Sequence, residues 1–96
     1  MKESKFQKEV KDELKKRFPG CIVLKNDPGS IQGIPDLSVF WQNHWGMLEV
    51  KNDPEAEHQP NQDYWVDYCN NMSYAAFINP QNKEEVLNGM ERSFKV

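Results

Sequence analysis

The chain has little of what secreted, membrane-spanning or zinc-binding proteins depend on. Only two cysteines, Cys21 and Cys69, occur among its 96 residues. They belong to no CxxC motif and no Cys/His cluster, so they predict free thiols in a reducing compartment. No apolar run is long enough for a signal peptide or a membrane span. We therefore expect a soluble protein of the cytoplasm, in a bacterium or a phage-infected host cell, with no membrane partner.

Positive charge is also scarce. The 12 Lys and Arg residues are outnumbered by 15 Asp and Glu, which gives a net charge of −3. This sign argues against binding nucleic acid through bulk electrostatics. The basic residues are concentrated near the start of the chain, where Lys5, Lys8 and Lys11 recur at helical spacing. Such a stripe can follow phosphates, although a solvated helix face is an equally good interpretation.

The residues that are present predict one α/β domain spanning residues 1–96. A chain of this length has room for one core, and three Trp, five Phe and three Tyr supply large side chains to fill it. Periodicity and Pro/Gly breaks predict the order helix, strand, hairpin, helix, strand, helix. The expected ranges are a helix 3–18, a strand 21–25, a loop 26–35, hairpin strands 36–41 and 45–51, a helix from Pro60 to about Asn70, a strand 73–78 and a helix 82–91. Pro60 is expected at the first helical position, and Asn82 with Glu85 as a capping box.

The hairpin carries the strongest physical signal. A turn at Gln42-Asn43 places Asp36 directly across from Glu49, on one face of the sheet, and Lys51 projects to the same face. Directly opposed carboxylates repel one another. A divalent cation offsets that repulsion, and Mg²⁺ binds through one or two carboxylates. The alternative interpretation is an ordinary strand edge, with Lys51 paired to one of the acids.

Three short motifs follow one another at intervals typical of a known nuclease family: Gly33-Ile34-Pro35-Asp36-Leu37, Glu49-Val50-Lys51 and Pro60-Asn61-Gln62. Together they resemble the PD-(D/E)XK superfamily, and more narrowly its virus-type replication-repair nuclease (VRR-NUC) domain. The likeness extends from Glu3 to about residue 90. It implies a small restriction-endonuclease-like αβββαβ core, with a mixed sheet flanked by helices and a C-terminal helix. It also implies hydrolysis of DNA phosphodiester bonds with Mg²⁺, for which Mn²⁺ is expected to substitute.

The resemblance also assigns roles to single residues. Asp36 and Glu49 resemble the metal-binding acids of the family, Lys51 resembles its catalytic lysine, and the backbone carbonyl of Val50 would be a further metal ligand. Members of the family complete this site with a glutamate on the first helix. Glu3 is the expected ligand because it falls within the apolar stripe of that helix, with Glu9 and Glu13 as the other glutamates available there.

A glutamine on the second helix is the last carried-over catalytic residue. Gln62 is expected in this role because it aligns with Trp65, Val66 and Cys69 and so points inward, where a polar group needs a partner. Gln59 is the competing candidate. His58 is a weaker candidate for a phosphate contact.

The expected substrate follows from the resemblance and not from any motif that reads base sequence. Lys5, Lys8 and Lys25 are the expected DNA contacts. Stand-alone members resembling this chain act on branched DNA as homodimers, which implies a Holliday-junction resolvase of phage or mobile-element origin. The alternatives are a non-catalytic interaction module that keeps the nuclease fold, and a nuclease for flaps, single strands or RNA.

Overall fold

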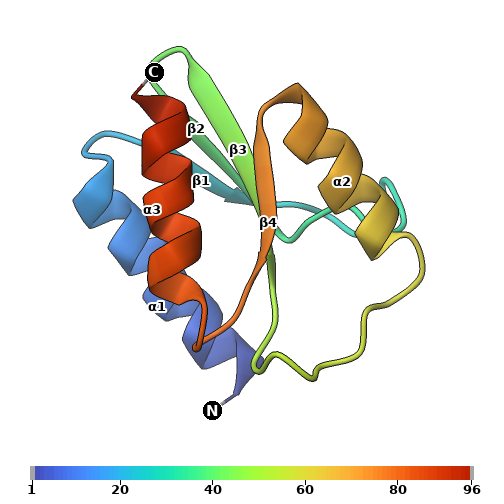
Figure 1. Cartoon of the computed structure of the whole chain (residues 1–96). Coiled ribbons are helices and arrows are strands. Elements are labelled where there is room, and N and C mark those ends of the chain that lie inside the picture. Colours follow the sequence, from blue (N-terminus) through green and yellow to red (C-terminus); the bar gives the residue numbers. More distant parts are fainter. Residues whose placement is uncertain (1, 96) are drawn as a thin grey trace.

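The computed structural model describes residues 2–95 and contains three helices and four strands in this range (Figure 1). In chain order they are α1 (Glu3–Arg17), β1 (Ile22–Lys25), β2 (Leu37–Trp41), β3 (His44–Val50), α2 (Gln62–Met72), β4 (Tyr74–Ile78) and α3 (Lys83–Phe94). The predicted α/β class and order of elements are confirmed, including the C-terminal helix.

The four strands form one mixed sheet in the order β1-β2-β3-β4. The first three strands are antiparallel neighbours, and β4 runs parallel to β3. A parallel pair needs a crossover connection, and here the crossover contains α2. The β2–β3 hairpin pairs Leu37 with Leu48 and Phe40 with Trp45. The predicted register of the hairpin is therefore confirmed.

The helices cover the two faces of the sheet unequally. Figure 1 shows α1 and α3 on one face and α2 on the other. The larger core lies on the α1–α3 face, whereas α2 packs mainly on β3 and β4 and covers a smaller cluster. Strand alternation divides the side chains between these faces: Leu37, Val39, Leu48, Val50 and Ile78 belong to the larger core, and Trp45, Met47, Ala75 and Phe77 to the cluster under α2.

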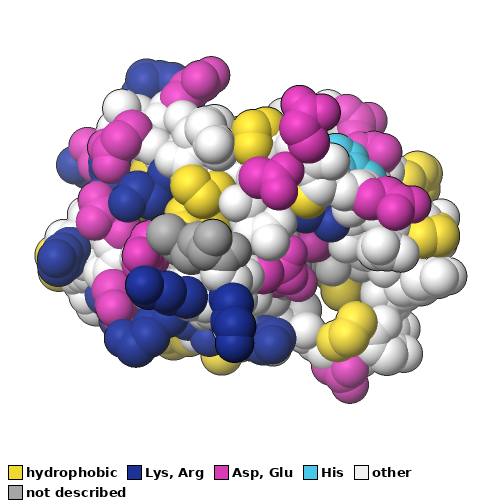
Figure 2. All heavy atoms as spheres, turned by 90° about the horizontal axis from the view of Figure 1, so that it is seen from below, with side chains coloured by type: hydrophobic (Ala, Val, Ile, Leu, Met, Phe, Trp, Pro, Cys, Tyr) yellow, Lys and Arg dark blue, Asp and Glu magenta, His cyan; other side chains and the backbone are white. Residues whose placement is uncertain are grey.

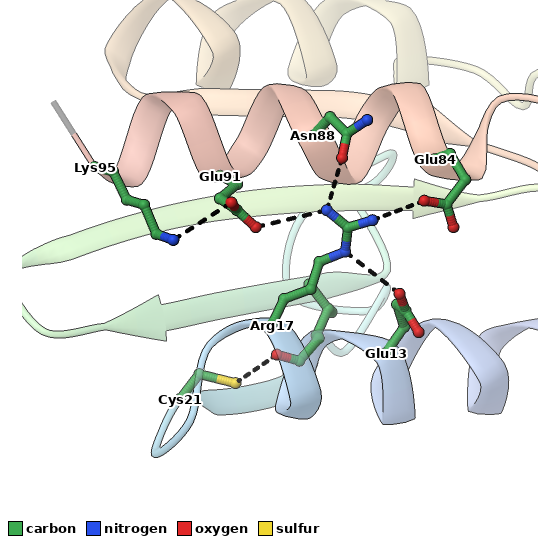
Figure 3. Close-up of polar contacts among 8 residues, drawn as sticks. Glu13, Arg17, Cys21, Glu84, Asn88, Glu91 and Lys95 are labelled. Carbon is green, nitrogen blue, oxygen red and sulfur yellow. Dashed lines mark hydrogen bonds and ion pairs between the residues drawn. The ribbon is translucent and has the colours of Figure 1, made fainter.

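Arg17 joins the two helices of the larger layer. Its guanidinium donates to Asn88 Oδ1 and to Glu84 Oε2, each at 2.8 Å (Figure 3). Glu13 and Glu91 lie at 3.4 Å and 3.6 Å from the same group. Only 17% of the Arg17 side chain is exposed, whereas its partner Glu84 is 68% exposed, so solvent reaches this network at the surface of the two helices. It holds α1 against α3.

Neither cysteine takes part in a disulfide bond. Cys21 and Cys69 are both free thiols, as predicted. Within residues 2–95, no helix combines the length and the apolar character that crossing a membrane requires.

The start of α2 differs from its prediction. The helix begins at Gln62 and not at Pro60, because Asn61 between them has a left-handed φ of 71°. A continuous right-handed helix cannot contain that conformation. Pro60 therefore lies in the turn that precedes the helix.

The expected capping box at the start of α3 is wrong. Asn82 precedes the helix, but its side chain makes no capping hydrogen bond. The Asn82 carboxamide instead accepts a hydrogen bond from the Asn79 N–H at 2.8 Å and donates one to the Phe77 carbonyl at 3.1 Å. The side chain thus ties the helix start to the end of β4, a tertiary role that competes with capping.

Candidate active site

Asp36, Glu49 and Lys51 meet where β2 begins and β3 ends. Asp36 directly precedes β2, and its Oδ2 accepts a hydrogen bond from the Val50 N–H at 2.8 Å. This bond fixes the Asp36 carboxylate against β3. Glu49 and Lys51 are two residues apart on an extended segment, so both project from the face that α2 covers. The structure thus brings together the two acids and the lysine.

Asn26, which the sequence analysis did not single out, holds the loop in front of Asp36. Its backbone N–H donates to the Asp36 carbonyl at 2.7 Å. Its Nδ2 donates to the Pro35 carbonyl at 2.8 Å, and its Oδ1 accepts from the Ser38 hydroxyl at 3.0 Å. An asparagine at the point where a strand gives way to a loop is the only sequence signal for this role.

A hydrogen-bonded chain links the lysine to the second acid through α2. Lys51 Nζ donates to Gln62 Oε1 at 2.8 Å, and Gln62 Nε2 donates to Glu49 Oε2 at 3.1 Å. Lys51 Nζ also donates to the Glu57 carbonyl at 3.0 Å and lies 4.0 Å from Glu49 Oε2. The structure therefore places Gln62 in the site, as an amide that orients both charged groups at once.

The environment of Glu49 strongly favours its neutral form. The residue is only 3% exposed, and burial is the main reason that its pKa rises from 4.5 to about 8. Asp36 adds to the rise in pKa through hydrogen bonding and charge, and Glu3 adds a smaller repulsion, while Lys51 acts in the opposite direction. In the cation-free protein the Glu49 carboxyl thus favours its protonated form near neutral pH.

The donor atoms fit a small, hard cation. Glu49 Oε1 is buried and has no hydrogen-bond partner among the residues described. A buried oxygen without a partner is costly, and a divalent cation would supply that partner while neutralising both acids. The carbonyl of a strand residue points to the same side as its N–H, so the Val50 carbonyl lies on the Asp36 side of β3. Asp36, Glu49 and this carbonyl are the groups that could hold the ion.

Glu3 is near this site without joining its two acids. Its charge raises the pKa of Glu49, which puts the start of α1 in the same neighbourhood. Across residues 2–95, however, no three side chains of Asp, Glu, His or Cys are grouped closely enough to hold one metal ion. Glu13, one of the other helix candidates, pairs with Arg17 in the α1–α3 layer.

The remaining loop residues take supporting positions. The Gln59 backbone N–H donates to Gln62 Oε1 at 2.8 Å, so Gln59 contacts the network through its main chain. The His58 ring stacks on Phe77 with ring centroids 3.9 Å apart, and its Nδ1 lies 2.7 Å from Asp63 Oδ1. Both contacts fix the loop that precedes α2.

The three lysines expected to contact DNA are all exposed. Lys8 is paired with Asp12 at 3.0 Å on the surface of α1. Figure 2 views the end of the molecule at which α1 begins, and Lys and Arg side chains gather there over α1, beside acidic side chains in the middle of the face. No protein-family model and no curated protein matches this chain.

Proposed function

We propose that this chain is a metal-dependent, structure-selective DNA endonuclease of the VRR-NUC type. The observation that carries the proposal is the buried Glu49 carboxylate. It has an oxygen without a partner, an adjacent second acid in Asp36, and a lysine held on the same face by Gln62. A structural role alone gives no reason to bury Glu49 beside the half-buried Asp36, because repulsion between neighbouring acids opposes folding.

Mg²⁺ is the proposed cofactor, with Mn²⁺ able to replace it. Asp36, Glu49 and the Val50 carbonyl would hold the ion, and Glu3 is proposed as a further ligand. Bound there, the ion would polarise the phosphoryl group and supply an activated water at neutral pH.

Lys51 is the residue proposed to position the scissile phosphate. Lys51 Nζ has three N–H donors, of which two are directed to Glu57 and Gln62. The third is proposed to contact an oxygen of the scissile phosphate, where a fixed positive charge would stabilise the charge that develops in the transition state. Gln62 holds the Lys51 ammonium and the Glu49 carboxylate in fixed positions relative to one another. Burial of this network excludes water that would screen these charges.

Branched DNA is the proposed substrate, cut by a homodimer in the manner of a Holliday-junction resolvase. Lys5, Lys8 and Lys25 are proposed to contact the DNA backbone. The sequence shows no zinc finger or helix-turn-helix that would read bases, so selection by DNA shape is the mode that fits. The proposed location is the cytoplasm of a bacterium or a phage-infected cell.

The experiment that tests this function is a panel of labelled substrates: a four-way junction, a flap, a plain duplex and a single strand. Each is incubated with the protein in Mg²⁺, in Mn²⁺ and in EDTA. We expect nicking that prefers the junction and stops in EDTA. Glu49→Gln removes the charge with almost no change of shape and should lower the rate by at least about 100-fold.

Glu55→Gln is the matched control, since it makes the same chemical change at an exposed position of the loop that follows β3. It should cleave as the wild type does. Cleavage that persists in EDTA, or a Glu49→Gln variant as active as Glu55→Gln, would rule out this function. Cleavage confined to flaps or single strands would keep the nuclease and reject the junction as its substrate.

A further inference from the structure

The loop between β3 and α2 is mostly exposed, yet it supplies two backbone groups to the candidate active site. This segment, drawn yellow-green in Figure 1, swings away from the sheet before it returns at the start of α2. The Glu57 carbonyl accepts a hydrogen bond from Lys51 Nζ at 3.0 Å, and the Gln59 N–H donates one to Gln62 Oε1 at 2.8 Å. The contacts of Lys51 and Gln62 therefore depend on a segment that lies largely in solvent.

Both backbone groups belong to the peptide units on either side of the His58 Cα. The Glu57 carbonyl is part of the unit before this atom, and the Gln59 N–H is part of the unit after it. Peptide units are planar, so the angle between these two is set by the φ and ψ of His58. The relative orientation of the two groups that reach the site is thus fixed at one residue.

His58 is anchored to two regular elements. Its ring stacks on Phe77 of β4, with centroids 3.9 Å apart and planes 10° apart, and its Nδ1 lies 2.7 Å from Asp63 Oδ1 in the first turn of α2. Within the part of the chain that the structure describes, no other side chain of residues 52–60 has a hydrogen bond, ion pair or ring contact outside the loop. We call the contacts of His58 with Phe77 and Asp63 the His58 clamp.

The His58 clamp lies beside the second acid of the site. Phe77 is the register partner of Glu49 on the neighbouring strand β3. Both side chains project to the face that α2 covers, since Phe77 packs in the cluster under α2 and Glu49 accepts from Gln62. The His58 ring thus covers the residue next to Glu49, and the loop is held at the point where it passes the site.

The Gln59 N–H also determines which way round the Gln62 carboxamide lies. Gln62 Oε1 accepts from both Lys51 Nζ and the Gln59 N–H, each at 2.8 Å, while its Nε2 donates to Glu49 Oε2 at 3.1 Å. A carboxamide rotated by half a turn would set its NH₂ group against two other donors. With both donors in place, the acceptor side of Gln62 stays directed at Lys51.

We propose that His58 is a positioning residue, and that the His58 clamp fixes the Lys51 ammonium through the Glu57 carbonyl and the Gln59 N–H. A lysine side chain is long and flexible, and Lys51 is only 7% exposed. It stays in one place only while its acceptors do. Loss of the clamp frees the two peptide units beside His58 and, with them, the acceptors of Lys51. In this role His58 touches no reacting atom.

The consequence for catalysis rests on the proposed nuclease function. Lys51 is proposed to contact the scissile phosphate, and a misplacement of about 1 Å at such a group can cost about 100-fold in rate. Loss of the clamp should therefore slow the chemical step. It should leave the affinity for DNA unchanged, because that affinity is proposed to come from exposed lysines elsewhere. The position of Lys51 itself can be measured without DNA.

A direct contact between His58 and a phosphate is the competing role. Its Nδ1 is already engaged by Asp63, whose negative charge would oppose an approaching phosphate. His58→Phe distinguishes the two roles, because it keeps an aromatic ring on Phe77 and removes both ring nitrogens. It should retain most of the hold on Lys51, whereas no phosphate contact of His58 could survive it.

The test is the rate at which the Lys51 amine reacts with N-hydroxysuccinimidyl acetate, followed by peptide mass spectrometry in the absence of DNA. His58→Ala and Asp63→Ala should each raise this rate by about 10-fold, because each removes contacts that keep the loop closed. Asp67→Ala is the matched control, since it makes the same change as Asp63→Ala at an exposed position one turn along α2. It should leave Lys51 as slow as in the wild type.

Cys69 reports whether α2 itself stays in place. Its thiol is 2% exposed and lies 3.7 Å from Met47 Sδ on the sheet, so its reaction with iodoacetamide should stay slow in every variant. If circular dichroism shows that His58→Ala is unfolded, Asp63→Ala takes its place. A folded variant in which Cys69 and Lys51 both react overturns the proposal, because His58 would then hold α2 as a whole. Equal rates at Lys51 in Asp63→Ala and Asp67→Ala also overturn it.

Cleavage assays separate this proposal from the proposed function. With junction DNA and Mg²⁺, His58→Ala should lower the single-turnover rate by about 10–100-fold and leave the junction Kd, measured in EDTA, unchanged. If His58→Phe loses cleavage as completely as His58→Ala while Lys51 stays protected, His58 acts on the substrate and the proposal is overturned. If the wild type cleaves no DNA but His58→Ala still exposes Lys51, the nuclease is rejected and the clamp is supported.

Discussion

At the scale of single residues, the buried Glu49 carboxyl makes the stability of the protein depend on pH. Its pKa in the folded protein is about 8, against 4.5 for an ordinary glutamate. Between these values the folded state binds a proton that the unfolded chain has released. The free energy of unfolding should therefore fall as the pH rises from 4.5 to about 8 in EDTA, by up to about 1.4 kcal/mol per pH unit. Urea unfolding at a series of pH values measures this slope.

The charged neighbours of Glu49 set the controls for that measurement. Asp36, Lys51 and Glu3 all act on its pKa, and Glu49→Gln removes the titrating group while they remain. The difference in stability between Glu49→Gln and the wild type should grow with pH across the same window. Glu55→Gln should keep the wild-type slope. Parallel curves for Glu49→Gln and the wild type would contradict the assignment of the raised pKa.

The two glutamines before and within α2 are distinguished by which of their atoms reach the site. Gln62 uses its side chain to join Lys51 to Glu49, whereas Gln59 contacts Gln62 through main-chain atoms. Partners that orient a ligand typically contribute about 10–100-fold to metal affinity or activity. Gln62→Ala should therefore lower the cleavage rate by roughly that factor, and Gln59→Ala should leave it near wild type. Equal losses in initial-rate assays would contradict this distinction.

Part of this site could be predicted because it depends on strand alternation. The period of two places Asp36 and Glu49 on one face once the hairpin turn is known. Asn26 and the Glu57 carbonyl could not be found that way. Both lie in irregular loops, and their partners are set by tertiary contacts that leave no periodic pattern.

At the scale of elements, the loop before β2 is fitted closely to the start of α2. Gly33 has a φ of +88°, and a Cβ there would approach the Asn61 carbonyl carbon to 2.6 Å and its Cβ to 2.7 Å. Gly33→Ala therefore adds both backbone strain and a clash. We expect it to destabilise the fold by roughly 2–4 kcal/mol and to lower cleavage, because the same loop carries Asp36.

Gly20 is the matched control for this contact. It has a φ of +87°, but a Cβ there would meet no atom within 4 Å. Gly20→Ala should therefore show the strain without the clash, at about 1 kcal/mol. Chemical denaturation of both variants isolates the contribution of the loop–helix contact. Equal losses of stability would show that Gly33 serves only its backbone conformation.

The boundaries of the elements were harder to predict than their order. In α1 the apolar periodicity of the sequence predicted the buried stripe of Phe6, Val10 and Leu14, because burial follows the helical repeat. The start of α2 followed instead from the left-handed Asn61. That conformation is linked to the close approach of Gly33, a contact distant in sequence. Local signals such as a proline at a helix start compete poorly with such contacts.

At the scale of the whole molecule, the two faces of the sheet differ in how completely they are closed. On the α1–α3 face, Phe18 and Phe94 pack at 5.1 Å and Arg17 joins the helices. On the other face, Ile22 and Leu24 belong to the predicted strand 21–25 but are more than half exposed. A strand pattern shows which side chains share a face, but not how far a helix extends over it. Which half of the sheet α2 covers is set by tertiary packing and not by the strand pattern.

The distribution of charge over the whole molecule decides whether an acidic protein can bind DNA. The net charge is −3, yet basic side chains gather over α1 at the end where the chain begins, which is also the neighbourhood of Glu49 (Figure 2). Lys5 is exposed in the first turn of α1. On the non-cleaving Glu49→Gln background, Lys5→Ala should weaken junction binding and reduce the slope of log K against log salt by about 1, the effect of losing one phosphate contact.

Lys95→Ala is the control, because Lys95 pairs with Glu91 near the C-terminus, at the opposite end of the molecule (Figure 1). Fluorescence anisotropy of a labelled junction across a salt series measures both slopes. If Lys5→Ala and Lys95→Ala change the slope equally, DNA is not held at the α1 end, and the position of the substrate relative to Glu49 must be different.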